Sequence, residues 1–189
     1  MTMYAILTAI VIALQLVCTF IKFGPFSITL ALTPIIVGAA IYGPKCGALL
    51  GFVFSAVVYI TGLMGYDGGF INMMMNYSAV GTTFICLFKG TAAGAVAGFV
   101  FNALQKKSSV AATMVSSALA PITNTGLFAL AMMTIFYGFL AGNAPEGQSP
   151  LGMLFLSWIG INFIVEFLVN IALGTVITRV VDYYNKRMR

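Results

Sequence analysis

Long apolar runs, separated by short stretches rich in glycine, proline and charged residues, dominate the chain. Several runs approach or exceed about 20 residues, the length of a helix that crosses the hydrocarbon of a bilayer. The ten-residue alternation of apolar and polar positions that is typical of membrane barrels does not occur. The pattern therefore predicts an all-α integral membrane bundle of six helices, which form one transmembrane domain over residues 1–189. The expected spans are residues 4–21, 28–42, 46–64, 80–104, 110–140 and 152–181.

Small side chains recur at every fourth position in three of these spans. The stripes are Ala5, Ala9 and Ala13; Gly47, Gly51 and Ser55; and Gly90, Gly94 and Gly98. Positions four apart share a face of a helix, and a face of small residues lets another helix approach closely. The two glycine stripes therefore predict close helix neighbours. The alanine stripe packs either inside this bundle or against a different membrane subunit, and the sequence leaves both alternatives open.

Composition and charge support the membrane class and set an orientation. Hydrophobic residues make up 61% of the chain and charged residues 7%, which cannot supply the surface of a water-soluble protein of this size. The formal charge of +5 comes mostly from basic residues at the ends of apolar runs, so it indicates topology rather than a nucleic-acid partner. Six spans place both termini on the side of Lys45, Lys106, Lys107 and Arg179. By the positive-inside rule, that side is cytoplasmic.

Three polar side chains interrupt the membrane-spanning sequence at similar depths. Lys89 is a functional candidate by default, because a lysine inside a membrane costs on the order of 3 kcal/mol. With a helix rise of about 1.5 Å per residue, Lys89 lies about 25 Å from the cytoplasmic edge, Asn124 about 22 Å and Glu166 about 20 Å. All three fall in the outer half of a hydrocarbon core about 30 Å thick. This agreement predicts one outward-facing site shared by three helices.

A surplus of amides, hydroxyls and aromatic rings near these residues favours a pocket for a small polar ligand. Residues 70–83 are then either an interfacial connector or a lid over the pocket. The structural alternative is an ion pair between Lys89 and Glu166 that only fixes helix register. Another alternative is an ion-coupled permease with Glu166 as its proton carrier. The predicted substrate-binding residues are Lys89, Asn124, Thr125, Glu166, Asn162, Asn170, Asn76, Tyr77 and Trp158.

The residues that usually carry catalysis or hold a metal are missing or badly spaced. The chain has no histidine, no paired intramembrane carboxylates and no nucleophile elbow, and Cys18, Cys46 and Cys86 lack the spacing of metal ligands. We therefore expect no enzymatic activity, no cofactor and no metal site, and we interpret the cysteines as packing residues. A P-loop is absent as well, so active transport would need energy from a partner or an ion gradient.

The motifs follow a recognisable order along nearly the whole chain. The alanine stripe is followed by residues 26–29, 41–44 and 47–51, then by Lys89 with its glycines, residues 123–125 and residues 162–166. This order resembles the substrate-binding S components of energy-coupling factor (ECF) vitamin transporters. The resemblance implies a multi-pass protein of a prokaryotic cell membrane that captures a water-soluble vitamin on its outer face. Helices four to six and their outer loops would bind the vitamin, and the loop after the first helix would act as a gate.

The resemblance also implies partners. The stripe of Ala5, Ala9 and Ala13 would dock to a transmembrane coupling subunit, which in turn associates with two cytoplasmic ATPases. The S component would topple in the membrane to release its vitamin inside.

Two departures from the family pattern bear on the identity of the vitamin. Lys89 stands where relatives often carry arginine, and a lysine keeps the charge but lacks the planar fork that chelates a carboxylate. Residues 28–33 lack the acidic stretch of the riboflavin members. The resemblance therefore favours a pantothenate-like ligand whose carboxylate meets Lys89, while riboflavin, folate and pyridoxine-type vitamins remain open.

Overall fold

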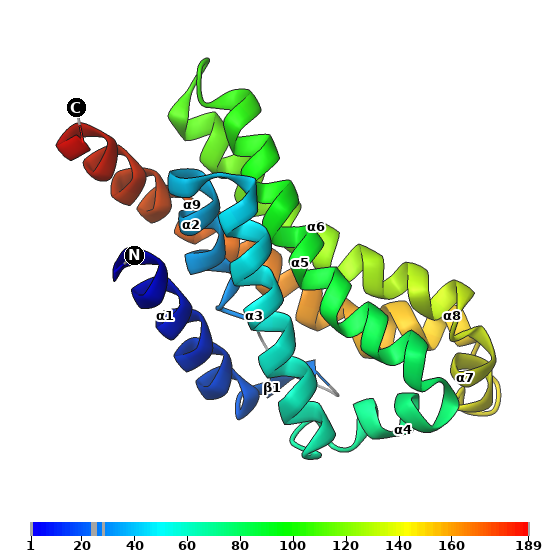
Figure 1. Ribbon diagram of the computed structural model, residues 1–189. Helices are drawn as coiled ribbons and strands as arrows, with labels where there is room; N and C mark the ends of the chain where they lie inside the picture. The colour runs from blue at the N-terminus through cyan, green and yellow to red at the C-terminus, as the bar shows by residue number, and fades with distance from the viewer. Residues whose placement is uncertain (1, 24–25, 28, 189) are drawn as a thin grey trace.

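The computed structural model describes residues 2–23, 26–27 and 29–188 and is helical almost throughout (Figure 1). The helices are α1 (Thr2–Thr19), α2 (Leu32–Tyr42), α3 (Pro44–Leu63), α4 (Phe70–Tyr77), α5 (Ala79–Leu104), α6 (Ser109–Thr134), α7 (Tyr137–Gly142), α8 (Pro150–Gly152), η1 (Met153–Ile159) and α9 (Gly160–Met188). Two very short strands, β1 (Lys22–Phe23) and β2 (Phe26–Ser27), form an antiparallel pair between α1 and α2. The predicted all-α class is confirmed. The expected gate falls partly on Gly24, Pro25 and Ile28, which lie outside the described residues.

Four helical segments are long and apolar enough to cross a membrane. They are α3, α5, α6 and the continuous run Pro150–Tyr184 through α8, η1 and α9. The helices α1 and α2 are apolar but shorter. The structure divides the predicted span 110–140, because α6 ends at Thr134 and α7 follows as a separate short helix. The predicted connector or lid over residues 70–83 contains α4 and the first turn of α5.

The close contact between α3 and α5 follows from their glycine stripes. Gly47 lies against the carbonyl of Gly94, and Gly51 lies against the carbonyl of Gly90. A Cβ atom at any of these four positions would collide with the backbone of the other helix, or with Ser55 in the case of Gly90. The two glycine stripes are therefore each other's close neighbours, and their contact fixes the height of Lys89 next to Gly90.

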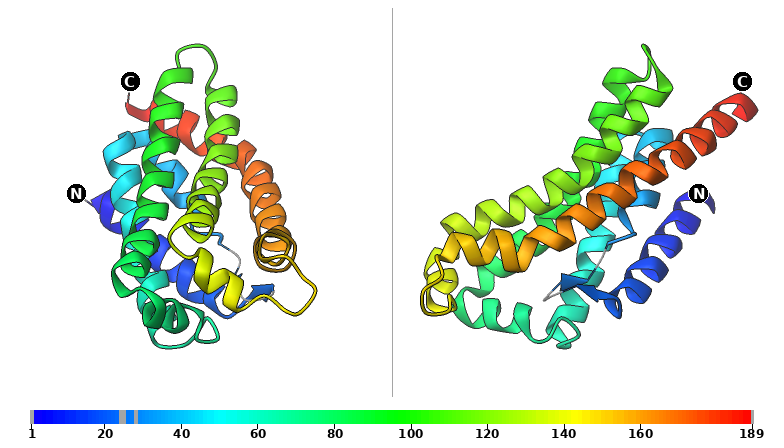
Figure 2. Two further views of the ribbon diagram at one scale, coloured as in Figure 1. Left: turned by 90° about the vertical axis from the view of Figure 1, so that its right-hand side faces the viewer. Right: turned by 180° about the vertical axis from the view of Figure 1, so that it is seen from behind.

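The second half of α6 follows its own direction. α6 carries Pro121 in its interior, where proline removes one backbone hydrogen bond and favours a kink. Figure 2 shows α6 changing direction midway between the α5–α6 turn and α7. Asn124 lies less than one turn after Pro121, so it belongs to the second half of the helix.

Two apolar clusters hold the bundle together. The first joins buried residues of α1, α2, α3, α5, α6 and α9, with Phe54 and Phe101 among the largest. The second joins α4, α5, α6, α7 and η1 around Phe70, Phe136 and Leu154. Polar side chains gather between these clusters, and the candidate site lies there.

The two ends of the molecule differ in what they contain. α1 begins and α9 ends on the side of the turn between α5 and α6, whereas α4, α7 and α8 gather at the opposite end (Figure 1, Figure 2). The candidate site reaches towards the second end, because Tyr66 and Asp67 of the α3–α4 loop belong to its wall.

Candidate functional site

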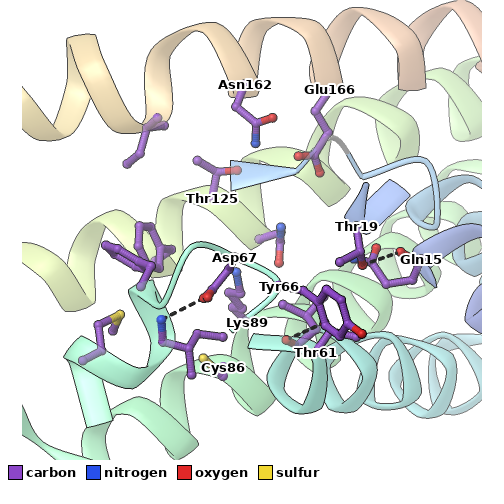
Figure 3. A pocket seen from close by; sticks show the side chains of 17 residues that line it. Gln15, Thr19, Thr61, Tyr66, Asp67, Cys86, Lys89, Thr125, Asn162 and Glu166 are labelled. Carbon is purple, nitrogen blue, oxygen red and sulfur yellow. Dashed lines mark hydrogen bonds between the residues drawn. The ribbon is translucent and has the colours of Figure 1, made fainter. Parts of the chain in front are cut away.

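A cavity of about 110 Å³ lies among α1, α3, α4, α5, α6 and α9 (Figure 3). Polar and charged side chains reach it from α1, α3, α5, α6, α9 and the α3–α4 loop, and apolar ones from α3, α4, α6 and η1. Of the predicted substrate-binding residues, the structure brings five together around this space: Lys89, Asn124, Thr125, Asn162 and Glu166.

One face of the last helix forms one wall of the cavity. Ile159, Asn162 and Glu166 line it at spacings of three and four residues, which place side chains on one face of a helix. Ile159 is the last residue of η1, a π-helical segment of a type that is rare and often found at functional sites. Glu166 is only 2% exposed, so its carboxylate faces the interior of the protein rather than lipid.

α6 contributes the neighbouring wall. Asn124, Thr125 and Phe128 line the cavity, and Asn124 is 5% exposed. The spacing of four between Asn124 and Phe128 places an amide and an aromatic ring on the same face. This wall therefore combines a hydrogen-bonding group with a flat apolar surface.

Lys89 reaches the cavity from α5 and makes a cation–π contact. Its Nζ atom lies 5.2 Å from the centroid of the Phe128 ring, within the range of a favourable contact between an ammonium and an aromatic face. Within the described part of the chain, no carboxylate oxygen lies within 4 Å of Lys89 Nζ. The alternative of a direct Lys89–Glu166 ion pair that only fixes register is therefore absent from this structure.

Buried oxygen atoms without hydrogen-bond partners surround the same space. Asn124 Oδ1, Asn162 Oδ1 and Glu166 Oε1 are buried, and each has no partner among the described residues. A buried polar group without a partner costs about 1–3 kcal/mol, so such groups are rare in finished protein interiors. Three of them beside one cavity, together with a lysine that has no carboxylate partner among the described residues, are typical of a site that is completed by a ligand.

α4 covers the cavity with its apolar side. Phe70, Ile71 and Met74 line the space and are buried. Asp67 fixes the start of this helix, because its carboxylate accepts hydrogen bonds from the backbone N–H groups of Gly69 (2.9 Å) and Ile71 (2.8 Å). α4 thus lies over the pocket, as the lid alternative predicts. It faces the pocket with apolar side chains, not with Asn76 and Tyr77.

Four of the predicted site residues do not line this cavity. Asn76 and Tyr77 are exposed, and Tyr77 contacts Phe136 and Phe139 instead. Trp158 lies one layer behind the wall, where its ring packs edge-on against Phe70 with centroids 5.1 Å apart. These residues support or border the site rather than face it.

Asn170 has a positioning role beneath the cavity. It is fully buried one turn after Glu166, and its Nδ2 donates a 2.8 Å hydrogen bond to the Glu166 backbone carbonyl. Its Oδ1 accepts a longer hydrogen bond of 3.5 Å from the Thr33 hydroxyl of α2. Asn170 therefore links α9 to α2 below the Glu166 side chain.

Sequence reasoning missed the contributions of α1 and of the α3–α4 loop. The missed lining residues with polar or reactive side chains are Gln15, Thr19, Thr61, Tyr66, Asp67 and Cys86. Gln15 carried a signal that could have been found, because it is the one strongly polar residue in the first apolar run. Thr19 and Thr61 each donate a hydrogen bond to a backbone carbonyl of their own helix, so they are satisfied without a ligand. All three cysteines are buried, and Cys86 lines the cavity.

The alanine stripe of α1 faces away from the bundle. Ala5, Ala9 and Ala13 are all exposed, whereas Leu7 and Val11 of the same helix are buried in the core. The stripe is therefore available to an external partner, and packing inside this bundle is excluded for it.

Comparison with known proteins agrees with these features. No curated protein matches the chain. The family described as ECF transporter, substrate-specific component, matches residues 1–181. That match includes every lining residue of the cavity and all three alanines of the exposed stripe. Apolar spans, a buried polar cavity and an exposed small-residue face thus occur in a chain that belongs to the family of ECF transporter substrate-specific components.

Proposed function

We propose that the protein captures a small water-soluble vitamin or related micronutrient, with high affinity, for an ATP-driven importer. The observation that carries this proposal is the set of unpartnered oxygens of Asn124, Asn162 and Glu166 around a cavity that also contains Lys89. A ligand that supplies donors to these oxygens and an acceptor to Lys89 satisfies all four groups at once. A purely structural membrane subunit has no need for this arrangement.

The groups that surround the cavity define the chemistry of the ligand. Lys89 favours an anionic group, since hydrogen bonds between ionised partners are stronger than neutral ones. Glu166 and the two asparagine oxygens favour O–H or N–H donors. A pantothenate-like molecule has a carboxylate, two hydroxyls and an amide N–H, and so matches both requirements.

The size of the cavity supports a small ligand. Its volume of about 110 Å³ compares with about 150 Å³ for a protein cavity that holds one benzene molecule. A three-ring vitamin such as riboflavin would require the walls to move further apart than a short-chain ligand does. Pantothenate-like and pyridoxine-type molecules are therefore favoured over riboflavin and folate.

If six spans cross the membrane and both termini are cytoplasmic, the side of the membrane that the cavity faces follows. In this arrangement α1 and α2 cross together with the four longer segments, and Lys45, Lys106, Lys107 and Arg179 lie on the cytoplasmic side. The cavity borders the loop with Tyr66 and Asp67 at the opposite end, so it opens to the outside of a prokaryotic cell.

The chain needs partners to transport its ligand. We infer that the exposed stripe of Ala5, Ala9 and Ala13 docks a transmembrane coupling subunit, which connects the protein to two cytoplasmic ATPases. The S component then topples in the membrane to release its vitamin inside. In this assignment one face of α1 borders the ligand cavity, and the face with the three alanines docks the coupling subunit.

Mass spectrometry of the purified protein tests the proposal. Wild-type protein, equilibrated with a mixture of water-soluble vitamins and then desalted, is expected to retain one of them at near-equimolar amount. The double variant Lys89→Met, Asn124→Ala is expected to retain at least about a hundredfold less, because it removes a charged and a neutral hydrogen bond. Retention of the same vitamin in unchanged amount would rule out this site.

A matched control carries the same chemical changes outside the cavity. Lys45 and Asn102 are exposed, so the variant Lys45→Met, Asn102→Ala should retain the vitamin like the wild type. Uptake by the protein alone in liposomes, driven by an imposed ion gradient, would support a self-sufficient permease instead.

A further inference from the structure

Gln15 presents an unexplained buried amide to the cavity. It is 2% exposed, lines the cavity from α1, and its Oε1 has no hydrogen-bond partner among the described residues. Figure 3 shows Gln15 beside Thr19, around the same space as Glu166 of α9 and Lys89 of α5. Apolar residues fill most of the buried face of α1, so packing alone does not account for a glutamine at this position.

The alanine stripe and Gln15 lie on opposite faces of α1. Gln15 follows Ala13 by two positions, which corresponds to about 200° around a helix of 3.6 residues per turn. Ala13 is exposed, and Gln15 is buried against the cavity. A short rigid helix therefore stands between the cavity on one side and the face available to a partner on the other.

We propose that Gln15 contacts the captured ligand and ties α1 to it, so that occupancy of the cavity is transmitted to the alanine face. This inference rests on the proposed function. In the empty protein the Gln15 amide has no partner in the cavity, and the ligand supplies one. A bound ligand therefore links α1 across the cavity to α6 and α9, which the empty state does not, and a coupling subunit that docks on Ala5, Ala9 and Ala13 can distinguish the two states.

Retention of vitamins by Gln15 variants provides the first test. Wild-type protein in lipid nanodiscs is equilibrated with thiamine, riboflavin, pantothenate, pyridoxine, folate, biotin and nicotinate, desalted, and analysed by mass spectrometry. Gln15→Leu is expected to retain about tenfold less of the vitamin that the wild type binds, because one buried hydrogen bond is lost. Gln15→Met is expected to behave like Gln15→Leu, and Val17→Ala, at a residue 60% exposed on the same helix, is expected to match the wild type.

Hydrogen exchange of the α1 peptide provides the readout that a merely structural role would not change. The vitamin that the wild type retains is added in excess to each protein. We expect slower amide exchange in residues 13–21 of the wild type and of Val17→Ala, and no change in either Gln15 variant even when the cavity is saturated.

The outcomes separate this inference from the proposed function. Retention of none of the seven vitamins by the wild type would overturn both. Retention by the wild type together with equal retention or equal slowing of exchange in the Gln15 variants would overturn the role of Gln15 alone. Both variants replace an unpartnered buried amide by an apolar group, so they are expected to fold, with thermal unfolding as the check.

Discussion

Lys89 and Glu166 are ionisable side chains that line one cavity, yet they do not form a direct ion pair in this structure. Each of them is costly to bury, and a direct pair would lower that cost without any ligand. Their separation leaves room for a molecule that satisfies both.

Replacement of Glu166 tests whether this residue lowers the stability of the empty protein while it contributes to ligand binding. Glu166→Gln is expected to raise the free energy of unfolding by about 1 kcal/mol, since a buried amide costs less than a buried carboxylate. The same change is expected to weaken ligand binding at least about tenfold, because it removes a charged acceptor. Thermal unfolding and vitamin retention measure the two effects.

The control for this prediction is Asp182→Asn. Asp182 accepts a 2.8 Å hydrogen bond from the Ser109 hydroxyl, far along α9 from the cavity. This variant should leave vitamin retention unchanged. A lower unfolding temperature in Glu166→Gln would instead indicate that the Glu166 charge stabilises the empty protein.

At the scale of elements, the site depends on how closely α3 and α5 approach. The contacts of Gly47 with Gly94 and of Gly51 with Gly90 leave no room for a side chain between the helices. Lys89 adjoins Gly90 on α5, so a shift of α5 away from α3 would move the Lys89 ammonium out of place.

Two glycine-to-alanine substitutions in helix interiors test this packing. Gly94→Ala is expected to destabilise the protein by about 1–3 kcal/mol, because the new methyl group meets the Gly47 backbone, which cannot rotate away. Gly126→Ala is the matched control, since no atom lies within 4 Å of its added Cβ. It is expected to be neutral or to stabilise by up to about 1 kcal/mol. Equal unfolding temperatures for the two variants would contradict the close approach.

At the scale of the whole molecule, α1 presents two different faces. Its buried face carries Leu7, Val11 and Gln15, and its opposite face carries the exposed alanines. The cavity reaches the α3–α4 loop and α4 at one end of the bundle, whereas α1 begins and α9 ends at the other. Substitutions on either face of α1 can therefore test the cavity and the proposed docking face separately.

A large side chain on the alanine face should block the proposed docking of the coupling subunit without affecting vitamin binding. Ala9→Trp is expected to retain its vitamin like the wild type but to abolish uptake by cells that also express the coupling subunit and the ATPases, because close helix approach needs small residues. Leu168→Trp, at a lipid-exposed position of α9, controls for the added bulk and should support normal uptake. Normal uptake by Ala9→Trp would show that the partner docks elsewhere.

Much of the fold and part of the site could be predicted from sequence, because these features depend on residues that are close together in the chain. Helix rise is set by hydrogen bonds between near neighbours in the chain, so distances along a helix need no tertiary information. This is why the depths of Lys89, Asn124 and Glu166 could be compared before their contacts were known, and the three residues do line one cavity. The glycine stripes predicted close neighbours for the same reason.

The rotation of each helix about its own axis depends on contacts between distant segments, and this was decided only by the tertiary structure. Asn76 and Tyr77 have suitable polar groups, but α4 turns Phe70 and Met74 towards the cavity because its apolar side seals the second core cluster. Gln15 became part of the site through the packing of α1 alone. The sequence by itself thus determined the membrane class, the grouping of Lys89, Asn124 and Glu166, and the close-packing stripes. Only the tertiary structure decided which side chains meet, because the burial that orients a helix comes from the whole bundle.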